Sequence, residues 1–391
     1  MNTFDEAYFD AGINRIGTNC AKWDEMRRET GDPDMIPMWV ADMDFPSPPA
    51  VQQALAGAAA QGTWGYTHPC DEDFEALCGY WARRHQTVFD PEDALLSPCV
   101  VTSLRISVRA LTAEGDGLLI NPPIYGPFFA SIKESGRRVV ESPLVQDEDG
   151  RWNLNFAEME EKLASGEAKA VLFCSPHNPC GRVWTKEELS ALAALCSKYH
   201  APLICDEIHA DFVYAPAVHH SILTVPGADS AVMLCAASKT FNIAGLQQSA
   251  VVCRDAEVRG KIGKEMIACG AVSGNIFALA ATRAAYRDCD AWLDGLLTYL
   301  RGNRETAAEH AAQRWPKVRV TPLDATYLMW LDCRALGLGQ EELMNRILQA
   351  HVKVNDGLFF GERGRGFIRL NIGCPRAQLR EALKRLDAVL G

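Results

Sequence analysis

The chain has 391 residues, of which 48% are apolar and 23% charged, as is typical of a globular protein with room for about two domains. Its net charge is −11 and its 39 basic residues are scattered rather than clustered, so we expect no nucleic-acid partner. No apolar run reaches the ~18 residues of a membrane helix and the first residues do not resemble a signal peptide, so we expect a cytoplasmic protein without a membrane partner.

The first 285 residues predict an N-terminal segment followed by a large α/β domain. Residues 1–45 contain little periodic structure, and we expect them to pack on the smaller C-terminal domain. From about 46 to 285, amphipathic helices alternate with short apolar strands. Helices are expected at 51–60 and 186–199, and strands at 117–120, 170–174, 202–205, 231–235 and 249–253. This alternation predicts a mostly parallel sheet between two layers of helices.

The pattern changes after residue 285 to that of a smaller α+β domain, 286–391. A long charged helix is expected at about 286–313. The elements predicted after it are a strand within 317–332, a helix at 340–350, a strand at 366–372 and a last helix from about Arg376. The fold class is therefore α/β, with a large domain and a small one.

Cysteine and histidine spacings predict no metal site. None of the 14 cysteines lies in a C-x-x-C pair, and no two histidines have the spacing of a helical zinc motif. Most of the cysteines lie in apolar runs, as expected for buried reduced thiols in a cytosolic protein. The pair His219-His220 has no acidic or cysteine neighbour in the sequence, and we predict that it lies at the surface.

Three polar residues follow predicted strands, where an open parallel sheet binds its ligands. They are Asn178, Asp206 and Lys239. Each alone has an ordinary explanation, as a turn residue, a helix cap or a solvated lysine. Together they supply what pyridoxal phosphate needs: an amine for a Schiff base, a carboxylate for the pyridine nitrogen and a donor for the ring oxygen. A helix that starts near 101–104 offers free N–H groups for the phosphate.

At this point the sequence resembles a known family. The matching motifs are Ser-Pro-His-Asn-Pro-Cys-Gly-Arg at 175–182, Cys-Asp-Glu-Ile-His-Ala-Asp at 205–211, Ser-Lys-Thr-Phe-Asn-Ile-Ala-Gly at 238–245 and Arg-Leu-Asn-Ile-Gly-Cys-Pro-Arg at 369–376. They resemble those of fold-type-I pyridoxal-phosphate enzymes of the aminotransferase class I/II superfamily. Residues 19–24, 38–45 and 65–67 resemble more narrowly the carbon–sulfur lyases of the cystathionine β-lyase and maltose-regulon-modulator subgroup. The resemblance runs from about residue 12 to 376 and implies an aspartate-aminotransferase-like fold.

The resemblance implies a role for each residue of the site. Those at the cofactor ring are Lys239 as the covalent anchor, Asp206 at the pyridine nitrogen, Asn178, His209 and Tyr125. Those at the cofactor phosphate are Thr102, Ser103, Leu104, Ser238 and, from the neighbouring subunit, Tyr66. Those at the amino-acid substrate are Arg369, the backbone near Ala41 and Asn178. Lys239, Tyr125 and Asp206 are the implied catalytic residues, and the shared Tyr66 implies a homodimer.

The leading hypothesis for the reaction is elimination at the Cβ–S bond of cystathionine or another cysteine S-conjugate, giving thiol, pyruvate and ammonia. Lys239 would take the α-proton, which requires a pKa below the ~10.4 of a free lysine. An aminotransferase is the alternative, although His209 stands where aminotransferases usually have tyrosine, which favours the lyase. A third hypothesis is a transcription-regulator-binding protein that keeps the lyase fold.

Overall fold

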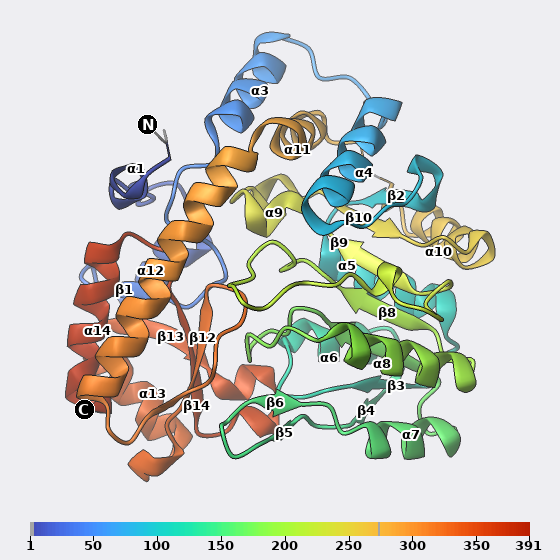
Figure 1. Cartoon of the computed structure of the whole chain (residues 1–391). Coiled ribbons are helices and arrows are strands. Elements are labelled where there is room, and N and C mark those ends of the chain that lie inside the picture. The colour runs from blue at the N-terminus through green and yellow to red at the C-terminus, as the bar shows by residue number, and fades with distance from the viewer. Residues whose placement is uncertain (1–3, 273) are drawn as a thin grey trace.

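A mostly parallel sheet forms the centre of the larger part of the chain (Figure 1). The computed structural model describes residues 4–272 and 274–391, and within them this sheet has seven strands. Their order across the sheet is β2 (Ala94–Ser97), β10 (Ser249–Val252), β9 (Val232–Cys235), β8 (Leu203–Asp206), β7 (Ala170–Cys174), β3 (Gly117–Ile120) and β4 (Arg138–Glu141). The strands from β9 to β4 are parallel, whereas β10 is antiparallel to both of its neighbours.

Helices bury both faces of this sheet, because successive side chains of a strand point to opposite faces. In β7, Leu172 belongs to the core on one face, and Val171 and Phe173 belong to the core on the other. The helices that contribute to the first core are α5 (Val100–Leu111), α6 (Gly126–Lys133) and α10 (Ala256–Ala268). Those that contribute to the second are α4 (Asp71–His85), α7 (Phe156–Ala164), α8 (Lys186–Lys198) and α11 (Ile276–Asp288).

A smaller sheet lies in the C-terminal part of the chain. Its order is β1 (Ile36–Met38), β13 (Val352–Asp356), β14 (Phe367–Asn371), β12 (Leu328–Asp332) and β11 (Arg319–Val320). Its helices are α13 (Gln340–Gln349) and α14 (Arg376–Leu390), and the long α12 (Asp290–Arg314) runs beside α14 (Figure 1). The remaining elements are α1 (Glu6–Asp10), α2 (Met26–Thr30), α3 (Pro49–Ala60), β5 (Val145–Gln146), β6 (Trp152–Asn153) and α9 (Ala237–Thr240).

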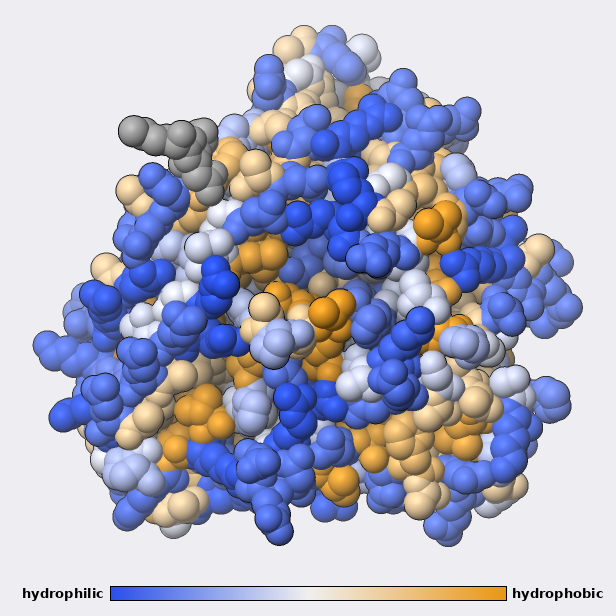
Figure 2. All heavy atoms as spheres, in the orientation of Figure 1, coloured by the Kyte–Doolittle hydropathy of each residue, from blue (hydrophilic) through white to orange (hydrophobic). Residues whose placement is uncertain are grey.

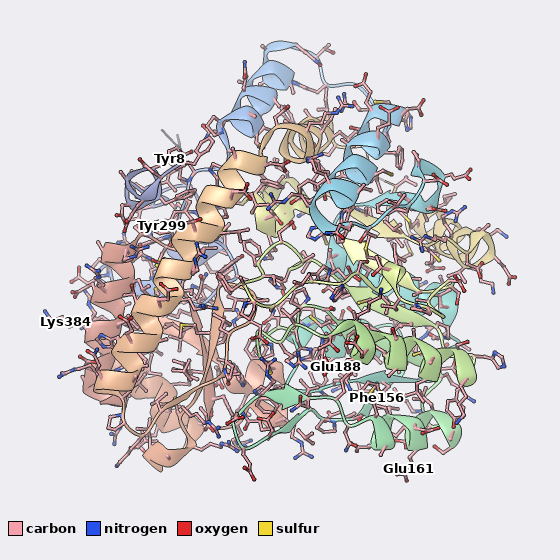
Figure 3. All side chains as sticks on the ribbon, in the orientation of Figure 1. Tyr8, Phe156, Glu161, Glu188, Tyr299 and Lys384 are labelled. Carbon is pink, nitrogen blue, oxygen red and sulfur yellow. The ribbon has the colours of Figure 1, made fainter. Side chains whose placement is uncertain are left out.

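The N-terminal segment is held against the C-terminal part by strand pairing and by side chains. Strand β1 pairs in parallel with β13. Tyr299 of α12, labelled in Figure 3 with Tyr8 of α1, donates a hydrogen bond to Asp10, and its ring centroid lies 5.5 Å from that of Phe9.

The face seen in Figure 2 is mostly hydrophilic, with apolar residues gathered around a hollow near its centre. No helix in the described part of the chain is both long and apolar enough to cross a membrane.

The predicted fold class, a large parallel-dominated α/β part with a smaller α+β part, is confirmed. The structure adds β2 and β4 to the strands predicted for the large sheet. These edge strands, Ala-Leu-Leu-Ser and Arg-Val-Val-Glu, contain apolar runs of only three and two residues. The long helix predicted at about 286–313 is found as α12, but it begins only at Asp290, since residues 286–288 end α11. The domain boundary predicted at 285 falls within α11 and stays a prediction.

Candidate active site

The carboxyl ends of the central strands converge on one cavity, as expected for a parallel sheet. Strand register places Asp206 opposite Cys174 on one side and Leu234 on the other, so the loops that follow β7, β8 and β9 start at one edge of the sheet. The predicted site residues that line this cavity are Ala41, Tyr125, Asn178, Asp206, His209, Ser238 and Lys239. Val101, at the helix start predicted for the phosphate, also lines it. Residues that the sequence did not single out line it as well, namely Cys99, Val100, Cys174, Ile208, Ala244, Gln247 and Gln248.

Lys239 lies on the short helix α9 directly after β9, with its side chain in the cavity. Its Nζ donates a 2.6 Å hydrogen bond to the carbonyl oxygen of Ala41, in the segment that leads from β1 to α3. Burial lowers the pKa of Lys239 below its ordinary value, because an ammonium group loses hydration there. The direction agrees with the prediction that this lysine acts as a base.

Asp206 ends β8 and is 4% exposed. Its Oδ1 accepts a 3.0 Å hydrogen bond from the N–H of Ile208. Burial raises the pKa of Asp206 to about 7, since this bond and the charge of Lys239 compensate only part of the lost hydration. A cationic ring nitrogen in the cavity would favour the ionised carboxylate, so Asp206 fits the pyridinium of pyridoxal phosphate.

Arg369 of β14 brings the smaller sheet to the site. It is 2% exposed, and Nη1 donates a 3.0 Å hydrogen bond to Oδ1 of Asn178, while Nη2 donates to the carbonyl of Trp39 at 3.0 Å and to Oδ1 of Asn355 at 2.5 Å. All these acceptors are neutral, and Nε has no partner among the described residues. Burial lowers the pKa of Arg369 to about 10. A buried guanidinium with neutral partners fits the bidentate binding of a substrate carboxylate.

The start of α5 differs from the predicted phosphate site. Helix α5 begins at Val100, so the N–H of Ser103 already donates to the carbonyl of Cys99, at 2.9 Å. The hydroxyl of Ser103 lies 3.1 Å from that of Ser249, and Leu104 is buried in the core beneath α5. The free N–H groups of a helix are those of its first turn, here at Val100, Val101 and Thr102. Thr102, Ser103 and Leu104, which are predicted to hold the phosphate, do not line the cavity, whereas Val100 and Val101 do.

Two further side chains of the cavity are kept neutral by burial. His209 is 3% exposed, its Nδ1 has no partner among the described residues, and burial lowers its pKa to about 3. Burial raises the pKa of Tyr125, whose ring centroid lies 5.8 Å from that of Phe359. An unpaired imidazole nitrogen and an aromatic face both fit a planar, polar ligand such as pyridoxal phosphate.

Tyr66 is placed away from this cavity. It lies between α3 and α4 with its side chain fully exposed, and it is not among the lining residues. Thr67, next to it, lies against the backbone at Gly274, where an added Cβ would be 2.2 Å from the Thr67 carbonyl oxygen. Tyr66 therefore does not pack in the core of its own chain.

The prediction that His219 lies at the surface is wrong. His219 is buried, and its Nε2 lies 3.0 Å from Oε2 of Glu207. Glu207 follows β8, twelve residues earlier in the chain, so the fold and not the sequence brings this acidic partner to the histidine. Among the described residues, no group of three or more His, Cys, Asp or Glu side chains could hold a metal ion.

Comparisons with known proteins agree with this arrangement. Residues 33–386 match the family described as aminotransferase class I and II. The chain is 39% identical over 385 residues to cystathionine beta-lyase PatB of Bacillus subtilis (strain 168), covering 98% of this chain and 99% of that one. It is 33% identical to protein MalY of Escherichia coli (strain K12), covering 97% of each. The crystal structure of cystalysin from Treponema denticola, which contains pyridoxal 5'-phosphate, superposes with a TM-score of 0.94 at 30% identity and covers 98% of each chain.

Proposed function

The chain belongs to the aminotransferase class I and II family, and on this basis we propose that it is a pyridoxal-phosphate-dependent carbon–sulfur lyase. Its substrate would be cystathionine or another cysteine S-conjugate, which reacts with water to give thiol, pyruvate and ammonia. The observation that carries the proposal is the single cavity that holds Lys239, Asp206 and Asn178, with Arg369 buried beside it. The near full-length similarity to a cystathionine beta-lyase supports the choice of reaction.

When bound, pyridoxal phosphate supplies a ring that accepts the electrons left on the α-carbon after proton loss. Lys239 would anchor it covalently and, once displaced by the substrate amine, take the α-proton, a role that its lowered pKa suits. Asp206 would keep the ring nitrogen protonated, and Asn178 would hydrogen-bond the ring oxygen. The Val100 and Val101 amides, with Ser238, would hold the phosphate at the start of α5.

The substrate would be held by its α-carboxylate. Arg369 has Nε without a partner and bonds only neutral acceptors, so a carboxylate is the ligand that it lacks. Tyr125 would cover the face of the cofactor ring, and His209 would lie beside it as a neutral group. Bound in this way, the substrate would have its α-proton near Lys239, and its Cβ–S bond would be free to break.

A product assay tests the proposed reaction. Purified protein is incubated with L-cystathionine, and pyruvate and free thiol are measured; a second incubation includes 2-oxoglutarate, and glutamate is measured. We expect pyruvate and thiol in equal amounts, without dependence on 2-oxoglutarate. Glutamate formed without pyruvate would show an aminotransferase instead. Absence of both products from a panel of cysteine conjugates would favour a regulatory protein that keeps the fold.

Arg369→Lys is expected to raise KM for the amino-acid substrate about ten- to a hundredfold, with a smaller change in kcat. Lysine keeps the charge but loses the planar pair of donors, and a hydrogen bond to a charged group contributes about 1.5–3 kcal/mol. Steady-state kinetics measures the split between KM and kcat. Arg365→Lys, at an exposed site near the same strand, is the matched control. An unchanged KM in Arg369→Lys would contradict the assignment.

We infer that the enzyme is cytoplasmic and that two chains form a homodimer. In this dimer, Tyr66 of each chain would complete the phosphate site of the partner. Its full exposure near Trp64, which is 58% exposed, supports this inference, because neighbouring exposed aromatic side chains are typical of interaction surfaces. A phenol that donates to a phosphate is worth about 1.5–3 kcal/mol. Tyr66→Phe is therefore expected to weaken cofactor retention about ten- to a hundredfold.

Mixed dimers test the same inference. Chains with Tyr66→Phe and chains with Lys239→Ala are combined under conditions that allow exchange. A heterodimer then has one site with both substitutions and one with neither, so activity should partly return. No recovery after proven exchange would show that Tyr66 serves its own chain, and normal cofactor retention in Tyr66→Phe would exclude a phosphate contact altogether.

A further inference from the structure

A buried polar cluster lies behind the cavity, on the turn that follows β8. Asp206 and His209 of this turn line the cavity, whereas Glu207 and Asp211 do not. Glu207 is 1% exposed, and its carboxylate accepts hydrogen bonds from the hydroxyl of Ser221 at 3.2 Å and from the N–H of Ile222 at 2.7 Å. The proposed mechanism uses Asp206 and His209, which line the cavity, but gives no role to Glu207 and Asp211.

Asp211 has partners from two other elements. Its Oδ1 accepts a 2.6 Å hydrogen bond from the hydroxyl of Tyr80 and lies 2.8 Å from Nε2 of His85, both on α4. Its Oδ2 accepts a 2.6 Å hydrogen bond from the hydroxyl of Thr240. The side chain of Asp211 is only 9% exposed. Burial opposes ionisation, yet the neighbouring His85 and the three hydrogen bonds together lower the pKa of Asp211 and favour the carboxylate.

Thr240 is the residue after Lys239 and is completely buried on α9. Its hydrogen bond to Asp211 thus joins the turn that carries Asp206 to the helix that carries Lys239. The ammonium of Lys239 is also held from the other side, by the carbonyl of Ala41. A charge-assisted hydrogen bond in a buried place is among the stronger ones, and it fixes geometry as well as adding stability.

We propose that Asp211 is a positioning residue that sets the place of Lys239 relative to Asp206 by holding Thr240. This inference rests on the proposed function, since it assigns Lys239 and Asp206 to the two ends of one cofactor. Loss of the Thr240 hydroxyl would leave the side chains of Lys239 and Asp206 unchanged. It would remove the hydrogen bond that holds α9, the helix that carries Lys239. Arg369, on β14, would not be affected.

Thr240→Val tests the inference, because valine keeps the shape of threonine and removes only the hydroxyl. The rate at which the purified holoenzyme loses cofactor is followed by its visible absorbance after dilution, and kcat and KM are measured on the same samples. We expect cofactor loss to be about ten- to a hundredfold faster and kcat to fall by a similar factor, with KM unchanged. Thr240→Ser, which keeps the hydroxyl, should restore both.

Ser221→Ala is the matched control. It removes a hydroxyl that donates a hydrogen bond to Glu207, the other buried carboxylate of the same turn. It should change the melting temperature but leave cofactor loss and kcat near those of the unmodified chain. The inference is overturned if Thr240→Val retains cofactor and turns over normally, or if Ser221→Ala has an equal effect. Asp211→Asn must change cofactor loss in the same direction as Thr240→Val, or the inference is overturned. A holoenzyme without pyruvate production would overturn the proposed reaction alone, whereas a chain without covalent cofactor would overturn both.

Discussion

Replacing Lys239 by alanine is expected to remove covalently bound cofactor and nearly all turnover. The substitution deletes both the amine that forms the covalent bond and the base that takes the α-proton. Loss of a general base alone costs about 10²–10⁴-fold in rate, and loss of the covalent anchor adds to this. The lysine lies in the cavity with its pKa lowered by burial, as both roles require.

Two measurements check this expectation. The first is pyruvate formation from L-cystathionine, and the second is the visible absorption band after gel filtration, with and without borohydride. Lys261→Ala, which changes a lysine on the surface of α10, is the matched control and should behave as the unmodified chain. If Lys239→Ala keeps a band that borohydride abolishes, another lysine is the anchor.

Asp206→Asn is expected to retain cofactor and lose turnover about 10²–10⁴-fold. The change removes the negative charge that would pair with the ring nitrogen in a site where water cannot replace it. Removing one partner of a buried ion pair costs about 3–5 kcal/mol, which corresponds to that range of rates. Burial raises the pKa of Asp206 to about 7 even with the charge of Lys239 nearby, so this carboxylate depends strongly on its surroundings.

Steady-state rates and cofactor content of the purified variant measure the effect of Asp206→Asn. Asp229→Asn, at an exposed position before β9, is the control for loss of one carboxylate elsewhere. Turnover near that of the unmodified chain would contradict the role of Asp206 at the ring nitrogen. Loss of cofactor together with activity would instead assign Asp206 mainly to binding.

The central strands could be predicted because each is a run of apolar residues between turns or helices. Runs such as 170–174 are buried on both faces of a parallel sheet, so they contain no alternation and are easy to find. Strands β1 and β2 are mostly apolar but only three and four residues long, and each pairs with a strand that is distant in the sequence. Strand β4 has only two apolar residues, which lie between charged ones.

The site was predictable where it follows from strand order. Asp206 ends a strand, Asn178 and Lys239 come shortly after one, and parallel strands bring such residues to one edge. The phosphate site was less predictable, because a shift of one residue in the start of α5 decides whether an N–H is free or already bonded within the helix. The partners of Asp211 and Glu207 come from α4, α9 and the loop before β9, and no local pattern marks them.

Peptide mapping by mass spectrometry after borohydride reduction tests the central claim most directly, since reduction fixes the cofactor to the residue that carries it. Purified holoenzyme is reduced, digested and searched for a peptide with the added mass of the pyridoxyl phosphate group. We expect one modified site, Lys239, in the peptide that contains Ser238 and Thr240, and no such peptide from Lys239→Ala. A modified lysine elsewhere, or a chain without the added mass, would contradict the assignment of this cavity as the active site.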